Sequence, residues 1–404
     1  MKTLNTILSA LKLPIVKSFI LCFAAIALAT SCEREPVLHL HRGNMQLQLP
    51  VVDVDLDVIW DYDLVYDTPY DWRSEWYYGD DPTLFGGIGE EYIGYHKPGI
   101  FELRRYFTGD VPNAPHSRRE NFLMEGYTFS HTFDWGYHDL LVWNYILPVG
   151  NDEAISTIID ERATLDSVFA YTNRTSRNIR LPNRAETIAT HYQPEELFSA
   201  YERAIEVDRD LTGFVWDEER QLYVKNLKST LKPLTYIYLT QIVLHGNGGR
   251  IVAVDGEADI TGMASKTNVN TGHTGLNPVG VNYSCGFTQH IDYKGEDVDI
   301  VGGRVLTFGL CALNGSAVSR GPISEEKDPN HHYIDCTFVF NNGAEKTMAF
   351  DVTDQVRKLF KGGVLTVHVN VDEIEIPDVS GGSGFNAVVV EREEEIHEIP
   401  IVVY

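Results

Sequence analysis

The stretch LQLPVVDVDLDVIW, Leu47–Trp60, alternates between apolar and acidic residues. Val52, Val54, Leu56 and Val58 fall on one face, and the intervening aspartates fall on the other. A period of two residues is typical of a β-strand with one buried and one solvated face. This stretch therefore predicts a half-buried strand close to the start of the folded body.

The chain downstream repeats this pattern of short strands and turns. Within Leu234–Leu244 both alternating faces are apolar, as expected of a strand that is covered on both sides. Helical patterns are confined to one or two turns at Pro194–Tyr201 and a short helix between Asp351 and Gly362. Further strand-like runs lie at Ile100–Phe107, Phe122–Phe133, Leu140–Leu147, Gln221–Leu231, Ile251–Met263, Tyr333–Phe340 and Val364–Val371. Many short strands with almost no helix predict a mainly β fold built from sandwiches.

The chain upstream of the first strand has the pattern of a secretory signal. Three lysines precede an apolar run from Phe19 to Thr30, and no acidic residue occurs before Glu33. This run is shorter than the roughly 20 apolar residues that a membrane-spanning helix needs. Small residues lead directly into Cys32, which resembles a bacterial lipobox and implies cleavage before Cys32 and its acylation. Ordinary signal cleavage, with Cys32 an incidental thiol, is the alternative.

The length of 404 residues exceeds the size at which single cores stop growing, so two domains are expected. We predict a lipoprotein signal peptide at 1–31, an N-terminal β-sandwich domain at 32–212 and a C-terminal β-sandwich domain at 213–404. The boundary is expected near Leu211–Gly213. The N-terminal domain carries an irregular aromatic insertion at 61–98.

The charge and the motifs exclude several classes of function. The formal net charge of −25 makes nucleic acid and anionic lipid headgroups unsuitable partners. Neither a nucleophile elbow nor a phosphate-binding glycine loop occurs, so we predict neither catalysis nor a cofactor. Cys285, Cys311 and Cys336 lack zinc spacing, and one disulfide or three free thiols both agree with the sequence.

The acidic and histidine motifs give no defined metal site. The aspartates of the first strand, counted from Asp53, do not have the glycine and glutamate of an EF-hand loop. A looser divalent site stays open there, against the alternative of a solvated strand face. His331 and His332 have no ligand spacing, so both are expected to be ordinary exposed histidines.

Two segments are candidates for contacts with a partner. In the aromatic insertion, Trp72, Trp76, Tyr77 and Tyr78 stand among acidic residues, and three roles are open: packing of the loop, a protein interface, or a glycan platform. At the C-terminus, Ile401, Val402, Val403 and Tyr404 are apolar without alternation and need a cover. The segment Ile396–Tyr404 therefore predicts either the closing strand of its own domain or a strand donated to another subunit.

Three groups of motifs, in this order, resemble the fimbrillin-like, fimbrial-anchor lipoproteins of the Bacteroidales. The first is Cys32–Pro36, CEREP, followed by a strand. The second comprises QPEELFSAY (Gln193–Tyr201), LKPLTYIYLTQIVL (Leu231–Leu244), GEADITGMA (Gly256–Ala264) and the segment around Gly272–Gly275. The third comprises FDVTDQV (Phe350–Val356) and DEIEIP (Asp372–Pro377) with a glycine-rich bridge. The aromatic insertion has no counterpart in the family pattern.

The resemblance implies two tandem transthyretin-like β-sandwich domains on an outer-membrane lipid anchor at Cys32, facing outward. It implies a role as an anchor or accessory subunit of a fimbria-like or adhesive assembly, with pilin-like proteins as partners. A glycan-binding surface lipoprotein that uses the aromatic insertion is the alternative function. A weaker third reading is an envelope hydrolase that depends on a divalent metal.

Overall fold

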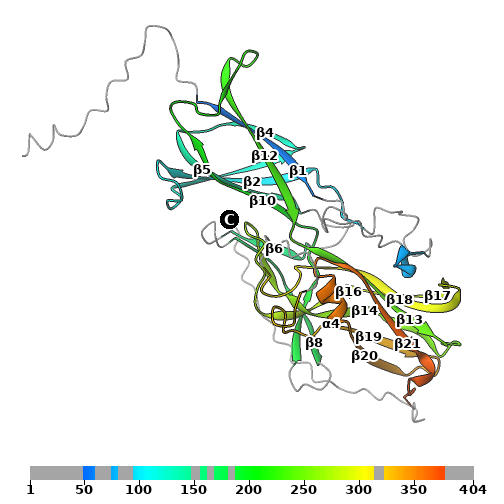
Figure 1. The fold of residues 1–404 in the computed structure, drawn as a ribbon. Helices are drawn as coiled ribbons and strands as arrows, with labels where there is room; N and C mark the ends of the chain where they lie inside the picture. Colours follow the sequence, from blue (N-terminus) through cyan, green and yellow to red (C-terminus); the bar gives the residue numbers. More distant parts are fainter. Residues whose placement is uncertain are drawn as a thin grey trace, which may run out of the picture. The chain divides into compact units, whose positions relative to one another are not determined.

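The computed structural model describes residues 49–59, 74–80, 94–146, 155–161, 168–180, 187–313 and 323–377. In these ranges the chain is almost entirely β-structure with a single α-helix, which confirms the predicted mainly β class (Figure 1). Apart from Leu49, the described residues belong to one compact unit, Pro50–Tyr404. No helix among them is long and apolar enough to cross a membrane.

The first sheet contains eight strands, and a hydrophobic core packs against one of its faces. In sheet order they are β3 (Arg118–Glu125), β2 (Ile100–Gly109), β5 (Gly136–Asn144), β10 (Phe198–Val207), β12 (Leu222–Pro233), β1 (Val51–Val58) and β4 (Thr128–Thr132), with β11 (Val215–Asp217) paired to β12. The four apolar residues of β1 that the alternation assigned to the core are buried. The predicted half-buried strand is therefore confirmed.

Two further sheets face each other across a second core. The four-stranded sheet has the order β17 (Gly286–Tyr293), β18 (Glu296–Thr307), β13 (Tyr236–His245) and β21 (Gly363–Asn370). The six-stranded sheet has the order β20 (Glu345–Asp351), β19 (Tyr333–Phe340), β14 (Ile251–Ala264), β16 (Pro278–Ser284), β9 (Thr187–Tyr192) and β8 (Arg174–Arg180). Ile242 and Val301 from the first of these sheets meet Ile260 and Phe338 from the second in one cluster. A small third sheet contains β15 (Lys266–Asn268), β7 (Phe169–Thr172) and β6 (Thr157–Asp160).

The sheets share strands across the predicted boundary at 212. Strands β10 and β12 lie on either side of it, and they pair with Phe198 opposite Pro233. Strand β9 comes from the first half of the chain and runs parallel to β16 of the second half, with Thr190 opposite Gly280. Residues from both halves thus contribute to the same sheets, and the division into two domains at 212 stays a prediction.

Strand β13 is covered on both faces, as its sequence predicted. Tyr238, Ile242 and Leu244 face the six-stranded sheet. Ile237, Leu239 and Val243 belong to the first core cluster, which also contains Trp76 and Tyr78. Strand β13, an inner strand of the four-stranded sheet, is therefore buried along nearly its whole length.

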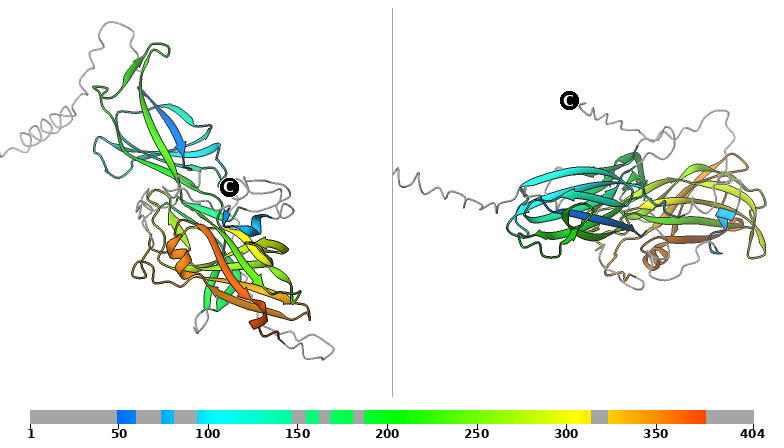
Figure 2. Two further views of the ribbon diagram at one scale, coloured as in Figure 1. Left: turned by 45° about the vertical axis from the view of Figure 1, so that its right-hand side comes forward. Right: turned by 90° about the horizontal axis from the view of Figure 1, so that it is seen from above.

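The short helix is confirmed as α4, Thr353–Lys358 (Figure 2). The Asp351 carboxylate accepts a hydrogen bond from the Thr353 backbone N–H at 2.9 Å, just ahead of the first turn. Val356 packs into the second core cluster. Gly362 ends the segment with φ of +97°, and a Cβ there would lie 2.1 Å from the Ile237 carbonyl oxygen. Only glycine suits both constraints.

The predicted helical turns at Pro194–Tyr201 are wrong, because this segment enters strand β10 at Phe198. Its glutamates form tertiary contacts that hold the chain extended. The Glu195 carboxylate accepts hydrogen bonds from the backbone N–H groups of Ser156 and Thr157 at 2.6 and 2.8 Å. The Glu196 carboxylate pairs with Arg304 at 2.6 Å. These contacts replace the helix start that the same residue types favour locally.

Candidate functional site

Several residues with predicted roles lie outside the described ranges. They are Cys32, Trp72, Ile401, Val402, Val403 and Tyr404. Lipidation, partner contact and strand donation at these positions stay predictions. Of the predicted aromatic contact residues, the structure describes Trp76, Tyr77 and Tyr78.

The segment Trp76–Tyr78 is fastened to the four-stranded sheet. The Trp76 indole donates a hydrogen bond to the Thr240 carbonyl oxygen at 3.2 Å. The Gln241 side chain accepts from the Tyr77 backbone N–H at 2.8 Å and donates to the Glu75 carbonyl oxygen at 2.7 Å. Gln241 is itself fully buried. A buried side-chain amide thus serves as the docking point for a loop that lies far away in the sequence.

Two glycines of the sheet make room for the Tyr78 ring. A Cβ on Gly302 of β18 would lie 2.5 Å from Tyr78 Cγ, and a Cβ on Gly286 of β17 would lie 2.4 Å from its hydroxyl oxygen. Cβ atoms do not approach other heavy atoms so closely, so a larger residue at either position would displace the ring. The sheet surface is therefore shaped to receive this segment.

Trp76 and Tyr78 are consequently too buried to offer their ring faces to a ligand. Trp76 is 2% exposed and Tyr78 5% exposed. Tyr77 is half-buried, with its ring centroid 4.5 Å from that of Tyr293. Of the three roles left open by the sequence, packing describes the contacts of these residues. A partner-contact role for the four aromatic residues stays a prediction.

A different aromatic pair is exposed, and the sequence reasoning missed it. Trp216 on β11 and Tyr223 on β12 face each other across the strand pair, with ring centroids 5.1 Å apart. They are 40% and 41% exposed, and the neighbouring Val215 is 71% exposed. The signal was available, because the two rings are placed symmetrically about the polar turn Glu218–Gln221 in the sequence.

An ion-paired turn holds this hairpin in place. Arg220 contacts Asp217 at 2.7 Å and Asp53 of β1 at 2.6 Å. The Arg220 hydrogen bond lowers the pKa of the Asp53 carboxyl, with a smaller contribution from Ser130, against the effect of burial. Asp53, the first candidate ligand of the looser divalent-metal site, is thus ion-paired with Arg220. Among the described residues, no group of three or more His, Cys, Asp or Glu side chains is arranged to hold a metal ion.

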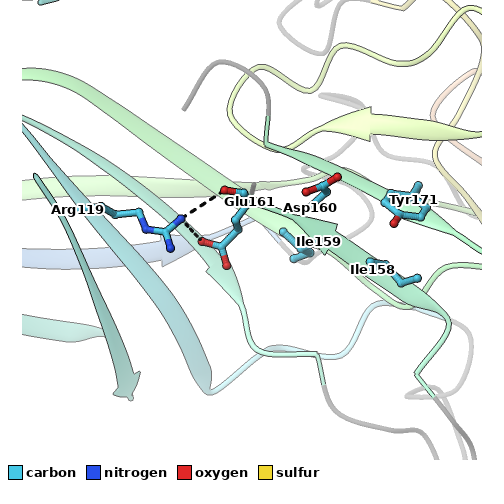
Figure 3. A pocket seen from close by; sticks show the side chains of 6 residues that line it. All are labelled: Arg119, Ile158, Ile159, Asp160, Glu161 and Tyr171. Atoms are coloured by element: carbon cyan, nitrogen blue, oxygen red, sulfur yellow. Dashed lines mark hydrogen bonds and ion pairs between the residues drawn. The ribbon is translucent and has the colours of Figure 1, made fainter. Parts of the chain in front are cut away.

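An open pocket of about 520 Å³ lies beside the small three-stranded sheet (Figure 3). Its lining residues are Arg119, Ile158, Ile159, Asp160, Glu161 and Tyr171. The Glu161 carboxylate is held by Arg104 through two hydrogen bonds of 2.7 and 2.8 Å, and Arg119 lies 3.3 Å from it. The charge of Glu161 is therefore largely neutralised within the protein, and among the described lining residues no nucleophile stands beside a base.

One of the histidines that the sequence predicted to be exposed is fully buried. His332 donates from Nδ1 toward the Thr261 carbonyl oxygen at 3.0 Å, and its Nε2 lies 2.8 Å from Asp328 Oδ2. Both partners are oxygen atoms that accept hydrogen bonds, so each ring nitrogen faces an acceptor. The prediction for His332 is wrong because Asp328, four residues upstream, supplies a buried partner for the ring.

The three inner cysteines, Cys285, Cys311 and Cys336, are free thiols.

Several sheets end in strands that are paired on one side within the described part of the chain. Strand β21 contacts β13 in parallel register, from Gly363 opposite Tyr238 to Asn370 opposite His245. It is the last strand of its sheet, as β20 is of the six-stranded sheet. An edge strand offers backbone N–H and C=O groups to which another strand can add.

No protein-family model matches the chain, and no curated protein matches it in sequence. Solved structures are similar to it at low identity. A protein proposed to be an adhesin from Bacteroides ovatus ATCC 8483 is 13% identical with a TM-score of 0.45, covering 82% of this chain and 94% of its own. One of the same description from Bacteroides thetaiotaomicron VPI-5482 is 10% identical with a TM-score of 0.40, covering 80% and 93%. The fimbrial anchor protein Mfa2 from Porphyromonas gingivalis is 8% identical with a TM-score of 0.36, covering 79% and 90%.

Proposed function

We propose that this chain is a lipid-anchored protein of the cell surface that acts as an anchor or accessory subunit of a fimbria-like or adhesive assembly. The observation that supports the proposal is the order of features along the sequence. A short apolar run ends in small residues and Cys32, and the sheet body begins soon afterwards at β1. A tethered body of this kind works by holding other molecules.

The architecture of the body supports a mechanical role. Long strands such as β14 and β18 are laddered by backbone hydrogen bonds to neighbours on both sides. Many such bonds share a load that is applied along the strands, so a sheet resists extension better than an equally long loop. The edge strands β21 and β20 are the places where a pilin-like partner would add a strand.

Metabolic labelling with palmitate tests the anchor. We expect the wild-type chain to carry the label in the membrane fraction and the Cys32→Ser variant to lose it. Cys285→Ser is the matched control, because Cys285 is a partly exposed thiol that lies in the folded body. Equal labelling of wild type and Cys32→Ser, or a wild-type chain found unacylated in the medium, would contradict the anchor.

Capture of pilin-like subunits tests the assembly role. Full-length chain and a variant lacking Ile396–Tyr404 are compared for co-purified subunits and for thermal stability. If the terminal segment is donated to a partner, its deletion abolishes capture and leaves the melting temperature unchanged. If it closes its own sheet, the deletion lowers the melting temperature, and a retained capture then rejects strand donation.

Glycan binding is the second candidate function, and the exposed pair Trp216 and Tyr223 favours it. Aromatic faces that remain accessible can receive the apolar face of a sugar ring. A glycan array with the wild type, Trp72→Ala and Trp216→Ala distinguishes the predicted insertion from the hairpin. A signal that neither substitution changes would reject both aromatic sites.

A further inference from the structure

Two histidines meet at one end of the four-stranded sheet. His245 is the last residue of β13, and His368 lies near the end of the neighbouring strand β21. Nε2 of His245 lies 3.0 Å from Nδ1 of His368. The His245 side chain is 28% exposed, so solvent reaches the pair.

The outer nitrogen of each ring has a partner of its own. Nδ1 of His245 lies 3.0 Å from a Glu296 carboxylate oxygen, which as an acceptor requires a proton on that nitrogen. The lone pair of a neutral His245 is therefore on Nε2, facing His368. The outer nitrogen of His368, Nε2, lies 3.5 Å from the Tyr293 hydroxyl. Tyr293 also packs edge-on against the His368 ring at 5.4 Å between centroids.

This arrangement has the features of a histidine metal site. In such sites the ring nitrogen that does not bind the ion usually donates to a carboxylate, carbonyl or water, which fixes the tautomer and the ring orientation. Two imidazoles on a tetrahedral ion, with bonds of about 2.0–2.1 Å, stand about 3.3–3.4 Å apart. From the observed 3.0 Å the pair would open by a few tenths of an ångström, and each ring would turn so that its lone pair points at the ion instead of at the other ring.

We propose that His245 and His368 bind a transition-metal ion of the zinc, copper or nickel type, with Glu296 as the positioning residue for His245. Imidazole nitrogen suits these ions, whereas calcium and magnesium require oxygen ligands. Water completes the coordination, since only two protein side chains supply ligands. For binding, the proton between the facing nitrogens passes through solvent to the outer nitrogen of His368, Nε2, which can then donate a hydrogen bond to the Tyr293 oxygen. The ion would cross-link β21, the last strand of its sheet, to β13.

Titration of the purified full chain with zinc chloride and nickel chloride tests this site. Isothermal calorimetry should show one site in the wild type, and the metal should raise its melting temperature. We expect His245→Gln and His368→Gln each to lose this binding, and Glu296→Gln to weaken it by about 10-fold or more. The control is His290→Gln, since His290 is 80% exposed on β17, pairs with Asp297 and has no second histidine in contact.

The outcomes separate the site from a simple hydrogen bond between two rings. Loss of binding in both histidine variants, with His290→Gln like the wild type, supports the proposal. Equal binding by wild type and His245→Gln, or no binding to the wild type at millimolar metal, overturns it. Circular dichroism of each variant without metal checks that the fold is retained. The His368→Gln variant gives an independent result if His245→Gln fails to fold.

Discussion

Two aromatic segments of this protein have similar composition and opposite exposure. Trp76 and Tyr78 lie against the four-stranded sheet and are almost fully buried. Trp216 and Tyr223 form a cross-strand pair that leaves about two-fifths of each side chain exposed. Both segments sit beside acidic residues, so composition alone does not distinguish them.

The difference comes from the surface opposite each segment. Facing Tyr78, β17 and β18 present Gly286 and Gly302, and the buried Gln241 binds the segment's backbone. Trp216 instead pairs with Tyr223 across β11 and β12, and 40% of it remains exposed. An aromatic cluster therefore indicates a binding surface only where the molecule does not already supply the complementary surface.

The largest expected effect is that of Trp76→Ala. It removes a buried indole and leaves a cavity against the sheet, so we expect the free energy of unfolding to fall by about 3–5 kcal/mol. Urea denaturation followed by circular dichroism measures this. If the loss is below about 1 kcal/mol, the segment is not part of the core and the contrast between the two aromatic segments fails.

Gly302→Ala tests the other side of the same contact. The added Cβ would lie 2.5 Å from Tyr78 Cγ and 2.6 Å from the Thr240 carbonyl oxygen, which belongs to a neighbouring strand. Overpacking of this kind costs about 1–3 kcal/mol. Gly99→Ala is the matched control, because nothing lies within 4 Å of a Cβ at that position. Equal melting temperatures for both variants would reject the interpretation that Gly302 makes room for the Tyr78 ring.

Local patterns predicted the features that depend on local residues. The alternation of β1, the double-sided burial of β13 and the short helix α4 all follow from neighbours along the chain. In each case the periodicity of the apolar residues indicates which face of the strand or helix packs against a core. The boundaries are also close, with Tyr333–Phe340 found as β19.

Most of the features that local patterns did not settle depend on residues distant in the sequence. The burial of Tyr78 depends on Gly302, and the extended form of Glu195 and Glu196 depends on partners such as Arg304. A single sequence does not state which distant residues meet, so tertiary contacts override local propensity without any local sign. His332 is intermediate, since Asp328 lies close enough to have suggested the pair.

Buried and exposed aspartates provide a further comparison between the covered and the solvent-exposed faces of the sheets. Asp335 on β19 stands opposite Asp259 on β14, and both are buried, with Arg177 3.3 Å from Asp259. Burial and, to a smaller extent, the charge of Asp259 raise the pKa of Asp335 to about 6 against the opposing charge of Arg177. The open face of β1 instead presents Asp55 to solvent.

The raised pKa predicts how stability depends on pH. The folded-state pKa of about 6 lies above the ordinary value of 3.8, so the folded protein binds the proton more tightly. The contribution of Asp335 to stability is therefore complete below about pH 4 and is lost as the pH rises through about 6. Asp335→Asn should raise the free energy of unfolding by about 1–2 kcal/mol at pH 8 and change it little at pH 4. Asp55→Asn is the exposed control, and a pH-independent effect of Asp335→Asn would contradict the burial argument.

The smallest effect on stability is expected for Trp216→Ala, and it sharpens the comparison most. The side chain is 40% exposed and is paired with Tyr223, so its removal should lower the free energy of unfolding by no more than about 1 kcal/mol. If this pair is the proposed contact surface, the same substitution should nevertheless reduce the capture of pilin-like subunits or glycans that the wild type shows. Urea denaturation and the capture assay are run on the same preparation, with Tyr223→Ala as a second variant of the pair. A large loss of stability would place Trp216 with Trp76 among the core residues, and unchanged capture would show that its exposure serves no contact.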